Sequence, residues 1–139
     1  MSLLVDTCIW SLSLRRRNGD LSRKELAAVN ELRAAIEKGD ARILGIVRQE
    51  LLSDIKSQPQ FQTLKETLSA FPDVDVESAD YVEAARLANV CRSKGVAAHV
   101  VDMLLCAIAE RHGWEIFTSD PDFERYSKLI GVRLHDYKA

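Results

Sequence analysis

Short apolar runs alternate along this chain with longer segments of helical periodicity, and this alternation constrains the fold more than any other feature. Runs at residues 3–5, 42–46, 74–76 and 115–118 indicate strands, and residues 132–134 indicate an edge strand. Strands that alternate with helices typically form a parallel sheet with helices packed on it. The pattern therefore predicts an α/β fold with a mainly parallel central sheet.

Helix start and stop signals fill the segments between these runs. Ser22 and Glu25 form a capping-box pattern before a helix that Gly39 is placed to end. Ser78 is placed to cap a later helix. Further helices are expected at about 8–15, around Glu50, at 59–70, at 102–112 and from Pro121. The helix at 102–112 is apolar almost all round, which favours burial against the sheet.

Length and composition exclude several classes of protein. We expect residues 1–139 to form a single domain, because 139 residues leave little room for a second core. The longest uncharged apolar run, residues 103–109, is far shorter than a membrane span. Three cysteines without a C-x-x-C pair indicate neither a disulfide framework nor a cysteine zinc site. We therefore expect a cytoplasmic protein that does not enter a membrane.

Four acidic residues fall at one edge of the expected sheet. Asp6 directly follows the first strand, and Asp120 follows the strand at 115–118. Glu50 lies in the helix after the second strand, and Asp102 begins the buried helix. Ligands of open parallel sheets bind at the carboxyl ends of the strands. The four acids are therefore candidate catalytic and metal-binding residues.

Each of these acids also has an ordinary structural interpretation. Asp6 could cap the next helix, and Asp120 before Pro121 is a strong helix-cap signal. Glu50 could face solvent, and Asp102 could be a first-turn acid favoured by the helix dipole. The structural interpretation must be applied separately to all four residues at the same sheet edge. That coincidence favours a shared site.

Convergence of the four carboxylates would constrain the chemistry. Two carboxylates about 5 Å apart repel by roughly 3 kcal/mol at an effective dielectric near 20. Such a cluster must take up protons or bind a hard cation, and Mg²⁺ or Mn²⁺ suits oxygen ligands. An ion held there could activate water and stabilise charge on a phosphodiester. The hypothesis is metal-dependent phosphodiester hydrolysis.

The acids stand in motifs that resemble those of the PIN-domain ribonucleases. The motifs are Leu-Leu-Val-Asp-Thr at 3–7, Gln-Glu-Leu-Leu at 49–52, Val-Asp at 101–102 and Thr-Ser-Asp-Pro-Asp-Phe at 118–123. The segment Val-Asp-Thr-Cys-Ile-Trp at 5–10 is most similar to the VapC toxins of toxin–antitoxin modules. The resemblance covers residues 2–135 and implies a three-layer α/β/α PIN-like fold.

The resemblance also implies roles for individual residues. Asp6, Glu50, Asp102 and Asp120 match the acids that bind Mg²⁺ or Mn²⁺, and Asp122 matches an auxiliary metal-binding acid. Asp122 could equally be a first-turn helix acid. Thr7 and Thr118 match hydroxyl residues that orient the carboxylates. The implied function is an Mg²⁺-dependent endoribonuclease toxin that cleaves RNA such as transfer or ribosomal RNA. The implied partners are a VapB-like antitoxin and a second copy of the chain.

Basic residues give the chain a way to attract RNA despite its net charge of −2. The cluster Arg15, Arg16 and Arg17 could contact RNA phosphates or could be an ordinary solvated loop. Arg48, two residues before Glu50, could contact phosphate or face solvent one helical step away.

Three other functions compete with the toxin. A phosphoacceptor signalling domain also groups acids at strand ends, but would be expected to carry an acidic pair at the first strand. Here Asp6 lies between Val5 and Thr7. A catalytically dead interaction module is the second alternative, although all four acids are present. A stand-alone PIN nuclease in RNA processing or decay is the third, and the residues do not separate it from a toxin.

Overall fold

Three short parallel strands form the centre of the fold in the computed structural model, which describes residues 1–138. The strands are β1 (Leu3–Val5), β2 (Ala41–Arg42) and β3 (Glu115–Phe117), in the order β2-β1-β3. Leu4 of β1 pairs with Arg42 on one side and Ile116 on the other. The expected α/β fold with a parallel sheet is confirmed.

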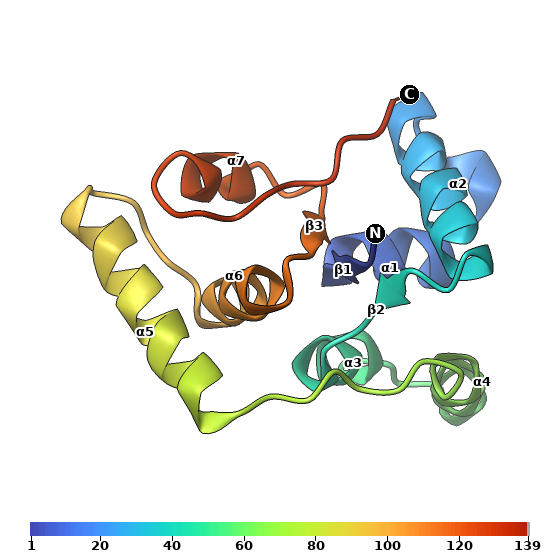
Figure 1. Ribbon diagram of the computed structural model, residues 1–139. Helices are drawn as coiled ribbons and strands as arrows, with labels where there is room; N and C mark the ends of the chain where they lie inside the picture. The colour runs from blue at the N-terminus through green and yellow to red at the C-terminus, as the bar shows by residue number, and fades with distance from the viewer. Residues whose placement is uncertain (139) are drawn as a thin grey trace.

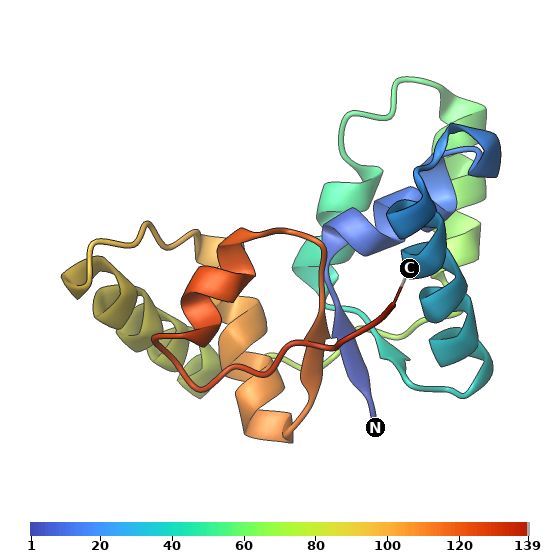
Figure 2. The same cartoon turned by 90° about the horizontal axis from the view of Figure 1, so that it is seen from above.

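Helices flank this sheet. In Figures 1 and 2, α1 and α2 lie on one side of the strands, and α5 and α6 lie on the other. The helices are α1 (Thr7–Arg15), α2 (Arg23–Glu37), α3 (Gly45–Leu52), α4 (Gln58–Leu68), α5 (Ser78–Ser93), α6 (Val100–His112) and α7 (Asp122–Ser127), with a 3₁₀ turn at Asn18–Asp20. The arrangement places the helices as layers around the strands.

Local signals set several of the helix ends. The capping box forms as expected, since Glu25 N donates to Ser22 Oγ and Ser22 N donates to Glu25 Oε1. Gly113 follows α6 at φ +70°, a left-handed conformation that glycine adopts without strain. Ser78 does not cap α5 but is its first residue. Asp80 serves the cap instead by accepting a hydrogen bond from Glu77 N.

The sheet is smaller than the apolar runs predict. The expected strand at 42–46 is wrong beyond Arg42, because the chain turns at Leu44 and begins α3 at Gly45. The expected strand at 74–76 is also wrong, since this region contributes only an isolated bridge between Ile43 and Asp73. The expected edge strand at 132–134 is reduced to one bridge between Ile116 and Leu134. These apolar side chains pack on the core without forming a continuous ladder.

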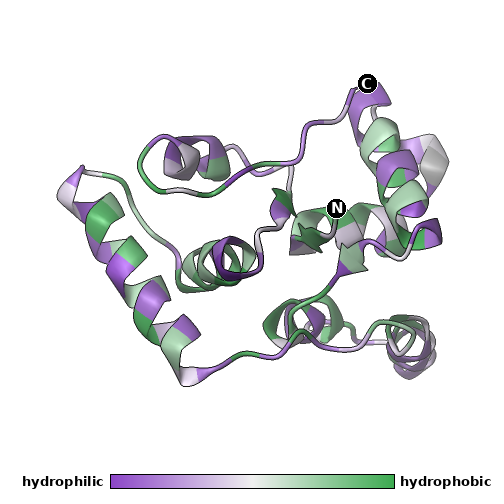
Figure 3. Cartoon of the chain, in the orientation of Figure 1, coloured by the Kyte–Doolittle hydropathy of each residue, from purple (hydrophilic) through white to green (hydrophobic). Residues whose placement is uncertain are grey.

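The core extends from the sheet to the helices on both of its sides, and α6 is the most completely buried helix. Every residue from Met103 to Ala109 is buried, as the continuous apolar pattern of this segment predicts. Figure 3 shows the hydrophobic colour over β1 and most of α6. Among the described residues, no helix combines the length and the hydrophobicity that crossing a membrane requires. The burial of α6 fixes its first turn, and with it Asp102, close to the strand ends.

Candidate functional site

Asp6 is the most constrained acid of the site. It follows β1 and caps α1, with its Oδ1 accepting a hydrogen bond from Thr7 N at 2.8 Å. Its Oδ2 accepts a second bond, from Thr118 Oγ1 at 2.8 Å, and the residue is 7% exposed. The capping interpretation of Asp6 is therefore correct. A cap does not require the bond from Thr118, which comes from a different element.

Thr118 and Asp120 form a short polar loop after β3. Thr118 Oγ1 accepts a hydrogen bond from Asp120 N at 3.0 Å, while its own proton goes to Asp6. Asp120 Oδ1 accepts a bond from Asp122 N at 3.0 Å. Asp120 thus supports the turn into α7 through one oxygen only. The loop carries the carboxylate of Asp120 next to the end of β1.

Glu50 reaches the site through Thr7. It lies in the second half of α3, and its Oε1 accepts a hydrogen bond from Thr7 Oγ1 at 2.7 Å. Thr7 directly follows Asp6, so this bond places the Glu50 carboxylate beside the first acid. The residue is exposed. Both hydroxyl residues expected to orient carboxylates, Thr7 and Thr118, therefore donate to one.

Asp102 lies in the same electrostatic environment as Asp6 and Asp120. It lies in the first turn of α6, is half-buried, and accepts a hydrogen bond from Tyr126 Oη at 3.0 Å. Burial raises the pKa of Asp102 to about 6, and the negative charges of Asp6 and Asp120 add to the shift. Burial also raises the pKa of Asp6, with a further contribution from Asp120. Asp6 and Asp120 are therefore close enough to Asp102 for their charges to oppose its ionisation.

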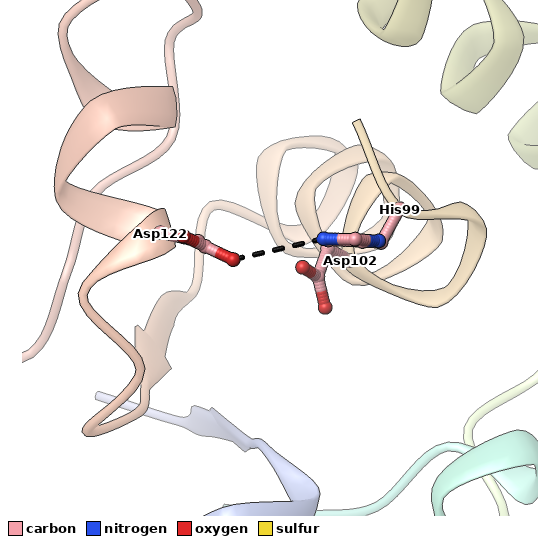
Figure 4. A group of neighbouring side chains, drawn as sticks. All are labelled: His99, Asp102 and Asp122. Carbon is pink, nitrogen blue, oxygen red and sulfur yellow. Dashed lines mark ion pairs between the residues drawn. The ribbon is translucent and has the colours of Figure 1, made fainter. Parts of the chain in front are cut away.

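A group of three side chains that could bind a metal ion includes Asp102 and two residues near it. His99, Asp102 and Asp122 each offer a ligand atom, and the three atoms lie within 4.8 Å of one another. Figure 4 shows these three side chains directed toward one another from α6 and α7. Asp6, Glu50 and Asp120 do not belong to this group. Asp122 is also the first-turn acid of α7 and pairs with Arg125.

Sequence reasoning missed His99, Cys8 and Tyr126. His99 precedes Asp102 by three residues, a spacing that puts both on one face at a helix start, and this was a readable signal. Cys8 lies two residues after Asp6, with its Sγ 3.6 Å from Asp6 Oδ2. Ser119 N also donates to this sulfur. Tyr126 had no comparable signal, because its position beside Asp102 depends on how α7 packs on α6.

The basic residues divide into two groups. Arg15, Arg16 and Arg17 are exposed at the C-terminal end of α1, and Arg16 pairs with Glu25 at 2.9 Å. Arg48 instead turns toward the chain itself. Its Nε donates to Asp73 at 2.8 Å, and its two terminal nitrogens donate to the carbonyls of Leu68 and Phe71. Arg48 therefore stabilises the C-terminal end of α4, and we do not propose it as an RNA contact.

Comparison with known proteins adds a family to this geometry. Residues 3–129 match the PIN domain. The chain is 27% identical over 140 residues to VapC ribonuclease Mb1587 of Mycobacterium bovis, a match that covers 98% of this chain and 99% of the relative. Ribonuclease VapC11 of Mycobacterium tuberculosis matches with the same identity and coverage.

Solved structures share the fold. The chain superposes on FitAcB from Neisseria gonorrhoeae with a TM-score of 0.74 and 19% identity, and the match covers 96% of each chain. VapBC2 from Rickettsia felis, bound to a DNA fragment from its promoter, gives a TM-score of 0.73 at 18% identity. That match covers 99% of this chain and 100% of the other. At such identities the likeness extends to the fold alone.

Proposed function

This chain belongs to the PIN-domain family, and on that premise we propose that it is the endoribonuclease toxin of a toxin–antitoxin pair. The family match confirms the resemblance found in the sequence motifs. Similar proteins are named ribonucleases, and structures with the same fold are VapBC complexes. PIN domains are nucleases, so the chemistry is hydrolysis of a phosphodiester bond. A phosphoacceptor domain is no longer a competing interpretation.

The observation that carries this proposal is the uncompensated negative charge of the site. The negative charge of Asp120 adds to the raised pKa values of Asp6 and Asp102, and the charge of Asp6 adds to that of Asp102. Within residues 1–138, no Lys or Arg forms a hydrogen bond or an ion pair with any of these three acids. Glu50 is likewise bonded only to Thr7. Such a set of oxygen donors fits a divalent cation, which would relieve the repulsion.

In this proposal Asp6, Glu50, Asp102 and Asp120 hold Mg²⁺ or Mn²⁺, with Asp122 as an auxiliary acid. When bound, the ion supplies Lewis-acid stabilisation of the charge that develops on the phosphodiester and lowers the pKa of water. Each of the four acids keeps oxygen lone pairs beyond those used by the hydrogen bonds described above. The acids can therefore bind a cation without giving up the contacts that position them.

Other residues of the chain keep the acids in place. Thr118 and Thr7 N hold the two oxygens of Asp6, Thr7 Oγ1 holds Glu50, and Tyr126 holds Asp102. Hydrogen bonds of this kind fix the direction of a ligand oxygen before the ion arrives. The conformational entropy of these side chains is lost when the protein folds, so the site is ordered before substrate binds.

An RNA substrate is proposed on the strength of the relatives' names and of the exposed arginines. Arg15 is the last residue of α1 and Arg16 and Arg17 follow it, and the nine residues of this helix span about 13 Å from its start beside Asp6. They offer positive charge at a short distance from a site that is itself negative. This local charge would attract phosphates although the whole chain carries a net charge of −2.

The partners proposed are a VapB-like antitoxin and a second copy of this chain. The VapBC complexes that share this fold support the antitoxin. A stand-alone nuclease would lack such a partner. Purification of the native protein from its own cells distinguishes the two, because a toxin is expected to bring a small antitoxin with it.

Cleavage of purified total RNA tests the proposed activity. We expect the wild-type protein to cleave RNA with Mg²⁺, and to lose this activity in EDTA or with the substitution Asp6→Asn. Asp75→Asn is a matched control, because Asp75 is exposed and remote from the four acids in the sequence. Equal cleavage by wild-type and Asp6→Asn proteins would contradict the proposal.

A further inference from the structure

We propose that His99, Asp102 and Asp122 form a binding site for a first-row transition-metal dication such as Zn²⁺. The three side chains are those drawn in Figure 4. The site shares Asp102 and Asp122 with the acids proposed for Mg²⁺, but it adds a nitrogen ligand and does not depend on nuclease activity. It therefore goes beyond the proposed function.

The spacing of the ligand atoms fits a single ion. His99 Nε2 lies 3.7 Å from Asp122 Oδ2, which is longer than a hydrogen bond. Two ligands of one tetrahedral ion, each about 2.0–2.2 Å from it, lie roughly 3.3–3.6 Å apart. All three ligand atoms are within 4.8 Å of one another. A small movement of the exposed His99 side chain toward the two half-buried carboxylates would bring the ligand atoms closer to this spacing.

Neighbouring residues orient the two carboxylates. Arg125 pairs with Asp122 Oδ1, which leaves Oδ2 as the oxygen nearest His99. Tyr126 donates to Asp102 Oδ2 at 3.0 Å. Outer-shell hydrogen bonds of this type set the direction of metal-binding carboxylates. The two carboxylates together balance the charge of a dication.

The backbone gives His99 access to both solvent and the acids. His99 is the residue before the first turn of α6, and its side chain makes no capping hydrogen bond. The side chain is 65% exposed, so an ion reaches it directly from solvent. Its position three residues before Asp102 is fixed by the buried helix that follows.

The nitrogen ligand determines which ions the site prefers. Imidazole suits Zn²⁺, Cu²⁺, Fe²⁺ and Ni²⁺, whereas Mg²⁺ and Ca²⁺ prefer oxygen ligands. One histidine and two carboxylates leave a fourth position of a tetrahedral Zn²⁺ open. The chain would then distinguish Zn²⁺ from Mg²⁺ through His99, since the acids alone offer both ions only oxygen.

Zinc titration of the metal-free full-length protein tests this site. Nitrogen-edited NMR of the histidine rings reports which of His99, His112 and His135 binds the ion, and calorimetry reports the affinity. We expect Zn²⁺, but not Mg²⁺, to shift the His99 ring nitrogens. Loss of a residue that only orients a metal ligand costs about 10–100-fold in metal affinity, so we expect loss of the ligand itself in His99→Gln to weaken Zn²⁺ binding by roughly a hundredfold.

Two variants complete the test. His112→Gln is the matched control, because His112 is exposed at the far end of α6 and stacks on Trp114. It should bind Zn²⁺ like the wild type. Asp6→Asn should also retain Zn²⁺ at His99, with circular dichroism confirming that each variant folds. Unshifted His99 nitrogens, equal losses in His99→Gln and His112→Gln, or loss of Zn²⁺ binding in Asp6→Asn would each overturn the proposal.

This test is independent of RNA cleavage. A protein that binds Zn²⁺ through His99 but does not cleave RNA would contradict the proposed nuclease and support the zinc site. A protein that cleaves RNA with Mg²⁺ while His99 is unaffected by Zn²⁺ would do the reverse.

Discussion

Thr118 and Asp6 are 112 residues apart in the sequence, yet Thr118 Oγ1 donates to Asp6 Oδ2 at 2.8 Å. The bond joins the carboxyl end of β3 to that of β1. It also fixes the one acid of the candidate site that is almost fully buried among the described residues, at 7% exposed. The candidate site therefore depends on the parallel pairing of these strands as much as on the acids themselves.

Removal of this hydroxyl should weaken metal binding without removing a carboxylate. We expect Thr118→Val to lower Mg²⁺ affinity by about 10–100-fold, the usual cost of losing a partner of a metal ligand. Thr118→Ser should retain most of the affinity. Thr63→Val, at an exposed position of α4, is the control. Calorimetric Mg²⁺ titration measures the effect, and an unchanged affinity in Thr118→Val would contradict it.

The free energy of unfolding of the metal-free protein should depend on pH because of Asp102. Burial and neighbouring charges raise the folded-state pKa of Asp102 from 3.8 to about 6. The stabilising contribution of protonated Asp102 is therefore complete below about pH 4 and is lost as the pH rises through 6. Asp102→Asn removes this loss. In EDTA we expect Asp102→Asn to exceed wild type in unfolding free energy by about 2 kcal/mol at pH 7.5.

Urea unfolding at two pH values checks this prediction. The stability difference between Asp102→Asn and wild type should shrink when the pH is lowered from 7.5 to 4.5. Asp75→Asn should show no such change, because Asp75 is exposed. A wild type more stable than Asp102→Asn at pH 7.5 without metal would contradict the assigned environment.

An ion pair between the buried Asp80 of α5 and the exposed Arg111 of α6 should contribute to stability but not to the chemistry. Asp80 is 3% exposed and accepts hydrogen bonds from Arg111 Nε at 2.7 Å and Nη2 at 2.9 Å. Burial alone would raise the pKa of Asp80, but Arg111 and Glu77 N outweigh it and lower the pKa. This stabilisation is present above pH 4 and is lost as the pH falls further.

We expect Asp80→Ala to lower the free energy of unfolding by about 2 kcal/mol, because it removes the charged hydrogen bonds from Arg111 and the bond from Glu77 N. Glu83→Ala breaks an exposed pair with Arg86 on the same helix and should cost less than about 1 kcal/mol. Thermal or urea unfolding separates the two variants. Equal losses would show that the Asp80 pair is not the link between α5 and α6.

The arginine cluster should contribute to RNA binding through charge alone. We expect replacement of Arg15, Arg16 and Arg17 by Gln to reduce the slope of log K against log salt by about 2. The measurement uses single-stranded RNA and the Asp6→Asn background, so that no cleavage occurs. Arg33→Gln, at an exposed position of α2, should leave the slope unchanged. A triple variant with the wild-type slope would assign RNA binding to another surface.

The alternation of apolar runs and helical segments predicted the fold class correctly. Neighbouring parallel strands need long connections, and helices provide them here. The extent of the sheet could not be read in the same way. Leu44 is fully buried, as a residue of a central strand would be. It is instead the residue before the first turn of α3. Burial on two sides produces the same apolar run in either case.

Asp6 and Asp120 could be predicted as neighbours because they follow strand ends, where position along the chain predicts position in space, whereas Glu50 and Asp102 lie in helices. His99 and Tyr126 belong to the helix layer, and their approach to Asp102 depends on how α6 and α7 pack. Arg48 lies close to a site residue in the sequence, but its side chain does not face the site. Its sequence neighbour Glu50 faces the site, but a two-residue offset on a helix turns the Arg48 side chain toward Asp73 and the end of α4.

The central claim is that acids from separate parts of the chain bind one divalent ion together, and direct Mg²⁺ titration tests it. Wild type and Asp75→Asn should bind Mg²⁺ with equal affinity. Asp6→Asn and Asp120→Asn, altered at positions that follow different strands, should each bind it weaker by roughly a hundredfold. Wild-type affinity in both Asp6→Asn and Asp120→Asn would contradict the claim.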